Sequence, residues 1–315
     1  MVVPNSPPNT NGTGGQFLSG SYTNQSGTRA YRLYIPKGYH GQPLPLIVML
    51  HACSQSPDDF AIGTRMNAFA DEQLFFVVYP GQTSSANRSK CWNWFLPEDQ
   101  QRDQGEPSLI AGITRQVAGS YMVDPQRIYV AGLSSGGAMA VILGITYPDL
   151  YAAIGNHSGL AYGAARDFSS ALAAMYQGGA GVMPVRVFNH VIEPNVRVVP
   201  MIVFHGDRDA TVHPRNADHV IAQWAQIHAE WEPHAPTGPE LKATVQRSQV
   251  PAGRFYTHAV YQDTRGEVIM ERWLVEGSGH AWSGGNSQGS FTDPYGPDAT
   301  QEMLRFFATH PRHRV

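Results

Sequence analysis

The chain has 315 residues, of which 42% are hydrophobic and 15% charged, so it is long enough to bury a core as one large α/β domain or two small ones. A net charge of −3 excludes the strongly basic surface that binding to nucleic acid or an anionic membrane would need. No run of 18 apolar residues is present, which excludes a membrane-spanning helix.

Residues 1–16 are rich in Asn, Gly, Pro and Ser, which predicts a flexible N-terminal arm. After this arm, short apolar runs typical of buried strands alternate with segments whose apolar residues recur at helical spacing. Strands are predicted over residues 29–36 (an edge strand), 45–50, 74–79, 128–131, 151–155, 200–204 and 268–275, and helices over 65–72, 107–121, 138–143, 216–231 and 300–308. The alternation predicts a mostly parallel central sheet with helices on both faces.

Two segments interrupt the alternation. Residues 160–198 are longer than a crossover needs and are predicted to carry a helix over 170–176 and loops over the site. Residues 232–255 contain several prolines and charges, which predicts a surface excursion. We interpret both as insertions in a single domain over residues 17–315.

The sequence Gly132-Leu133-Ser134-Ser135-Gly136 lies between a predicted strand and a predicted helix. A G-x-S-x-G pattern in this context is typical of a nucleophile elbow, a strained turn that exposes a serine hydroxyl. Glycines are required where side chains would clash with the crossing backbone, and the following helix directs its positive end at a developing oxyanion. The alternative is an ordinary strand-to-helix turn.

A serine nucleophile needs a base and an acid that orients the base, and in this type of fold they follow in the order serine, acid, histidine. The loop after the strand at 200–204 offers Asp207 and Asp209. We favour Asp209, three residues beyond Gly206, because the turn at His205-Gly206 must be complete before a side chain can point at the site. Asp207 is suited to capping that turn. His280, carried by a glycine-rich loop after the last strand, is the candidate base. The backbone N–H groups of Ser135 and Cys53 are the candidate oxyanion donors.

Five segments in this order resemble the poly(3-hydroxybutyrate) depolymerase family of esterases, which belongs to the α/β-hydrolases and is related to feruloyl and acetylxylan esterases. The resemblance extends from about residue 17 to about residue 310. The segments are His51-Ala-Cys-Ser-Gln-Ser-Pro-Asp-Asp-Phe60, Cys91-Trp-Asn-Trp94, Gly132-Leu-Ser-Ser-Gly136, His205-Gly-Asp-Arg-Asp209 and Gly279-His-Ala-Trp-Ser-Gly-Gly285.

The resemblance implies an α/β-hydrolase fold, a Ser134–Asp209–His280 triad, and an oxyanion hole formed by Cys53 and Ser135. Two positions depart from the family pattern: Ala52 stands where glycine is usual, and Ser135 where alanine is common. The resemblance also places Cys53 near Cys91, and we hypothesise a disulfide between them. Three tryptophans flank the motifs and are candidates for an apolar wall that binds substrate, with core packing as the alternative. They are Trp92, Trp94 and Trp282.

The expected function is hydrolysis of carboxylic esters through an acyl-enzyme, without a metal or organic cofactor. The resemblance favours 3-hydroxybutyrate oligomers or polyester as substrate, with feruloyl or acetylxylan esters as the alternative. A relative that binds a ligand without catalysis is the alternative from another class. The oligomeric state is left open by the sequence. The N-terminus lacks the basic and apolar regions of a signal peptide, so we expect either a cytoplasmic protein or a secreted one whose leader has been removed, and we favour the secreted one.

Overall fold

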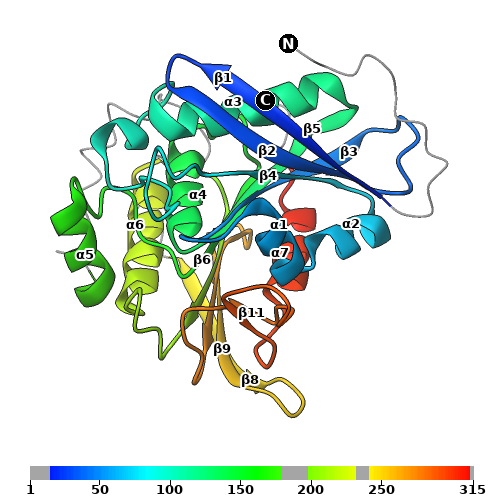
Figure 1. Ribbon diagram of the computed structural model, residues 1–315. Helices are drawn as coiled ribbons and strands as arrows, with labels where there is room; N and C mark the ends of the chain where they lie inside the picture. Colours follow the sequence, from blue (N-terminus) through cyan, green and yellow to red (C-terminus); the bar gives the residue numbers. More distant parts are fainter. Residues whose placement is uncertain (1–14, 179–197, 232–240, 313–315) are drawn as a thin grey trace.

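A computed structural model of the chain describes residues 15–178, 198–231 and 241–312. Within these ranges ten strands form one sheet in the order β1-β2-β4-β3-β5-β6-β7-β10-β9-β8, with β1 and β8 at its two edges (Figure 1). The strands of this sheet are β1 (Gln16–Asn24), β2 (Gly27–Ile35), β3 (Leu44–Leu50), β4 (Phe76–Pro80), β5 (Val123–Leu133), β6 (Ala153–His157), β7 (Met201–Gly206), β8 (Lys242–Gln249), β9 (Phe255–Gln262) and β10 (Val268–Val275).

The six central strands, β4, β3, β5, β6, β7 and β10, run parallel, as the buried apolar runs predict. Their register aligns the carboxyl ends of neighbours: Leu133 pairs with His157, His157 with Phe204, and Val275 with Gly206. The loops that follow β5, β6, β7 and β10 therefore begin at the same edge of the sheet. In doubly covered parallel sheets this edge is where sites are built.

Helices cover both faces of the sheet. One apolar layer joins the sheet to α3 (Gly105–Ser120), α4 (Ser135–Thr146) and α6 (Arg215–Trp231), and includes residues of α5 (Phe168–Gln177). The opposite layer joins it to α1 (Pro57–Thr64), α2 (Met66–Gln73) and α7 (Ala299–Thr309). Alternate residues of β3 enter opposite layers, which explains why this strand is apolar throughout: Val48 lies in the first and Ile47 in the second.

One sequence prediction about the sheet is wrong. The strand predicted at residues 29–36 is not at the edge, because β1 pairs along its whole length. Part of the predicted surface excursion at 232–255 is exposed but regular: it lies in the β8–β9 hairpin, which extends the sheet through β10. The helix predicted at 170–176 is confirmed as α5, whereas residues 179–197 and 232–240 of the two insertions lie outside the described residues. The single domain over 17–315 stays a prediction.

Three short elements complete the described structure: the 3₁₀ helix η1 (Pro97–Gln100) and the paired strands β11 (Trp282–Ser283) and β12 (Thr292–Asp293). Among the described residues, no helix combines the length and apolar character required to cross a membrane.

Candidate active site

Ser134 stands at the turn between β5 and α4 in a backbone conformation that L-amino acids rarely adopt, with φ 58° and ψ −120°. Strained non-glycine residues of this kind persist only where the surrounding structure holds them, and they concentrate at functional sites. The backbone N–H of Ser134 donates to the carbonyl oxygen of His157 over 2.8 Å. The backbone therefore makes a strained turn between strand and helix, as the G-x-S-x-G pattern predicts.

The two glycines of the motif are required because three chain segments cross here. A Cβ added at Gly132 would lie 2.8 Å from the carbonyl oxygen of Leu50. A Cβ at Gly136 would lie 2.8 Å from the carbonyl oxygen of His51 and closer still to that of Leu50. Real Cβ atoms do not approach backbone so closely, so either methyl group would push β3 away from the elbow.

We expect a Gly136→Ala variant to lose at least about 3 kcal/mol of unfolding free energy, because the clash is with backbone that cannot rotate away. Gly119 in α3 is a matched control: a Cβ there meets no atom within 4 Å. Gly119→Ala should be neutral or stabilising by at most about 1 kcal/mol. Urea unfolding of both variants tests the crowding, and equal unfolding free energies would contradict it.

Asp209 and His280 are brought together, as the sequence predicts. Asp209 Oδ2 lies 2.7 Å from His280 Nδ1 and 3.4 Å from His205 Nε2, while Oδ1 accepts the backbone N–H groups of Thr211 and Val212 at 2.9 and 2.8 Å. Burial alone would raise the pKa of Asp209, but the hydrogen bonds from His205 and His280 outweigh it and hold this pKa well below its usual range. The carboxylate therefore stays charged beside the imidazole.

Asp207 braces the loop that carries His280. Its carboxylate accepts the backbone N–H of Gly277 over 2.6 Å, and its own N–H donates to the carbonyl oxygen of Val275. The loop after β7 and the loop after β10 pass so closely that a Cβ at Gly206 would lie 2.6 Å from the carbonyl oxygen of Gly279. Asp207 thus has a structural role, but it braces the loop after β10 instead of capping its own turn as the sequence predicts.

His157, which the sequence did not single out, links the elbow to the histidine loop. Its carbonyl oxygen holds the N–H of Ser134, and its ring Nε2 accepts the backbone N–H of Ser283 over 3.0 Å. The ring is stacked on Trp282. Burial, reinforced by the neighbouring His205 and His280, lowers the pKa of His157 well below that of a free imidazole, so it remains a neutral acceptor.

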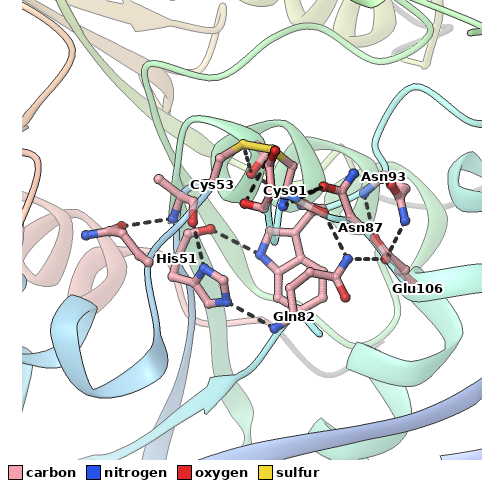
Figure 2. Close-up of a disulfide and its surroundings, with 12 residues drawn as sticks. His51, Cys53, Gln82, Asn87, Cys91, Asn93 and Glu106 are labelled. Atoms are coloured by element: carbon pink, nitrogen blue, oxygen red, sulfur yellow. Dashed lines mark hydrogen bonds between the residues drawn. A yellow bond between two sulfur atoms is a disulfide. The ribbon is translucent and has the colours of Figure 1, made fainter. Parts of the chain in front are cut away.

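The candidate oxyanion loop after β3 is covalently tied to the segment that contains Trp92 (Figure 2). Cys53 and Cys91 form the hypothesised disulfide, with Cα atoms 4.1 Å apart. Ser135, the first residue of α4, contacts both partners of this link. Its Oγ lies 3.5 Å from Cys53 Sγ and accepts the N–H of Trp92 over 3.3 Å. The two residues predicted to supply the oxyanion donors thus lie side by side.

Hydrogen bonds among buried polar groups hold the candidate oxyanion loop and the segment bridged to it in place (Figure 2). His51 Nε2 accepts the backbone N–H of Gln82, and its Nδ1–H donates to the carbonyl oxygen of Ala52 over 2.7 Å. Burial lowers the pKa of His51 to about 4, which keeps this ring neutral. Glu106 accepts hydrogen bonds from Gln82 and from both the backbone and side chain of Asn93. Ala52 does not have a positive φ, so its methyl group adds no left-handed strain at that position, whereas Ser54 in the same loop has φ 64°.

The three tryptophans proposed to contact substrate are buried. Trp92 donates its indole N–H to the carbonyl oxygen of His51, and Trp282 donates to Thr300 Oγ1. Trp94 is 4% exposed and packs edge-on against Phe95. These contacts favour core packing over the predicted apolar wall. In the described ranges, no group of three or more His, Cys, Asp or Glu side chains has the arrangement of a metal site.

Comparisons with known proteins identify the family of the chain. Residues 29–234 match the family model described as esterase PHB depolymerase. The chain is 30% identical over 253 residues to poly(3-hydroxyalkanoate) depolymerase C of Paucimonas lemoignei, covering 78% of this chain and 57% of that one. It is 28% identical to feruloyl esterase B of Neurospora crassa, covering 90% of this chain and 89% of the relative.

Among solved structures, the acetyl xylan esterase from Aspergillus awamori has a TM-score of 0.70 and 18% identity, covering 93% of this chain and 99% of that one. This likeness shows the α/β-hydrolase fold. The family match over residues 29–234 and the 30% identity to the depolymerase show that this chain belongs to the esterase PHB depolymerase family.

Proposed function

We propose that the chain is a serine esterase in which Ser134 is the nucleophile, His280 the general base and Asp209 the residue that orients His280. The backbone N–H groups of Cys53 and Ser135 are assigned to the oxyanion. The observation that carries the proposal is the 2.7 Å contact between Asp209 and His280, in loops that start at the same sheet edge as the strained Ser134.

The chemistry follows from these positions. His280 takes the Ser134 proton as the hydroxyl oxygen attacks the ester carbonyl, and the two N–H groups stabilise the oxyanion that forms. His280 then gives its proton to the departing alcohol, which leaves an acyl-enzyme. A water molecule, deprotonated by His280, attacks the acyl group and releases the acid and the serine. The charged Asp209 stabilises the imidazolium present in each half of the cycle.

The substrate we favour is an ester of 3-hydroxybutyrate, as an oligomer or a polyester. The depolymerase relative from Paucimonas lemoignei and the name of the family support it. A feruloyl or acetylxylan ester is the second candidate, because the Neurospora crassa feruloyl esterase matches over 89% of its own length whereas the depolymerase matches over 57%.

A direct competition among substrates separates these candidates. We would measure kcat/KM for 3-hydroxybutyrate trimer, methyl ferulate and acetylated xylo-oligosaccharide, with Ser134→Ala as the background. The proposal predicts the highest value for the trimer. A higher value for methyl ferulate or the acetylated sugar would replace the favoured substrate, and activity that survives in Ser134→Ala would remove the serine mechanism.

We also propose that the protein works outside the reducing cytoplasm, because disulfides such as Cys53–Cys91 persist in oxidising compartments. Esterase activity found only in the cell extract of the producing organism, and none in its medium or periplasm, would contradict this location.

A further inference from the structure

Phe291, between β11 and β12, is an aromatic residue in an unfavourable place. Its side chain is 41% exposed, and its backbone has φ 51°, in the left-handed region that favours glycine. A phenylalanine in this conformation costs free energy that packing of an exposed ring does not recover. The strained backbone and exposed ring of Phe291 therefore indicate a role other than stabilising the fold.

The backbone around Phe291 is held in place by a polar network. Its carbonyl oxygen accepts the N–H of Trp282 over 2.7 Å. The preceding residue, Ser290, donates its N–H to Asp59 Oδ1 over 3.0 Å, and its carbonyl oxygen accepts the side-chain N–H of Gln55 over 3.1 Å. These bonds fix the backbone from which the ring projects.

Gln55 connects that network to the candidate oxyanion loop. Its side chain is buried, and its Oε1 accepts the backbone N–H of Ala52 over 3.0 Å, one residue before Cys53. Phe291 is therefore fixed relative to the oxyanion loop through a chain of three hydrogen-bonded residues, Ser290, Gln55 and Ala52.

The ring also adjoins the candidate base. The rings of Phe291 and His280 meet edge to face, with centroids 6.5 Å apart and planes at 76°. In the proposed reaction, His280 hands its proton to the oxygen of the departing alcohol. The alcohol portion of the ester therefore departs beside the imidazole that Phe291 adjoins.

We propose that Phe291 is a specificity-determining residue that packs against the alcohol portion of the ester and favours alcohols with apolar carbon groups, such as the methyl-bearing chain of a 3-hydroxybutyrate unit, for which a benzyl alcohol is the strongest probe. The inference rests on the proposed function, because it places the alcohol by the role given to His280. An exposed aromatic face gains free energy when an apolar group covers it, and that gain is largest for another ring.

The test varies the two halves of the substrate separately. One series keeps acetate and changes the alcohol from ethyl to benzyl, and a second keeps ethanol and changes the acid from acetate to hexanoate. Phe291→Ala and Phe291→Gly should lower kcat/KM for benzyl acetate about 10-fold or more, with less than about 3-fold change for ethyl acetate. The ratio of hexanoate to acetate should stay unchanged.

Phe255→Ala is the matched control, because Phe255 is 40% exposed on β9 and contacts Arg247. It should leave both series unchanged. Phe291→Gly should keep or raise Tm, since glycine adopts the left-handed conformation freely. An equal loss on every ester, a loss that follows the acid, or a fall in Tm in Phe291→Gly would overturn the assignment. If Ser134→Ala retained activity, the failure would instead belong to the proposed function.

Discussion

An Asp209→Asn variant is expected to hydrolyse esters roughly 10⁴-fold more slowly than the unmodified chain while remaining folded. The side-chain oxygen 2.7 Å from His280 Nδ1 belongs to a carboxylate whose charge is held by two histidines and two backbone N–H groups. An amide has the same shape but no charge, so it neither stabilises the imidazolium nor enforces the tautomer with a proton on Nδ1. The measurement is kcat/KM on a p-nitrophenyl ester, with circular dichroism to verify the fold.

Asp207→Asn is the control, because the two aspartates lie in one loop but Asp209 contacts the His280 ring, whereas Asp207 contacts backbone. Asp207 accepts a backbone N–H from Gly277, and an asparagine oxygen can accept the same bond. We expect kcat/KM to change less than about 10-fold. If Asp207→Asn caused the larger loss, the acid would have to be reassigned to Asp207.

Replacing both Cys53 and Cys91 with alanine should lower the free energy of unfolding by about 4 kcal/mol, the chain-entropy value for a loop of this length. The two cysteines are 38 residues apart, so their bridge removes much of the freedom of the unfolded chain. We also expect kcat/KM to fall, because the bridge ties the loop of Cys53 to the segment that Ser135 contacts. Urea unfolding and ester hydrolysis measure the two effects.

Reduction of the unmodified protein is the matched experiment, since it opens the same bridge without changing a residue. It should reproduce the loss of stability, and the double variant should not respond to reductant. Two free thiols titrated in the denatured, non-reduced protein would contradict the disulfide, and an unchanged unfolding free energy in the double variant would contradict its stabilising role.

The central strands were predictable because burial on both faces leaves a continuous apolar run. β10 occupies the predicted residues 268–275, and β3 begins one residue before its predicted start at 45. β8 gave no such signal, since nearly all of its residues are exposed and neither face is apolar. β1 begins at Gln16, at the boundary of the predicted arm, and its half-buried residues alternate with exposed ones. Pairing with the rest of the sheet makes these segments strands.

The proximity of site residues was predictable where order along the chain selects them. Asp209 and His280 follow neighbouring parallel strands, so their meeting follows from topology. His157 was missed because its role depends on which atoms its ring reaches, and no motif marks these. For the tryptophans, proximity to motifs suggested substrate contact, whereas the burial of Trp92 and Trp282 favours the alternative of core packing.

The central claim is that the hydroxyl of Ser134 is the activated nucleophile, and it is tested most directly by mapping the adduct of a fluorophosphonate ester on the intact protein. The account predicts one adduct per chain, on the peptide that contains Ser134, and none in Ser134→Ala or after the active site has been blocked with substrate. An adduct on another residue, or equal labelling of Ser134→Ala, would contradict it.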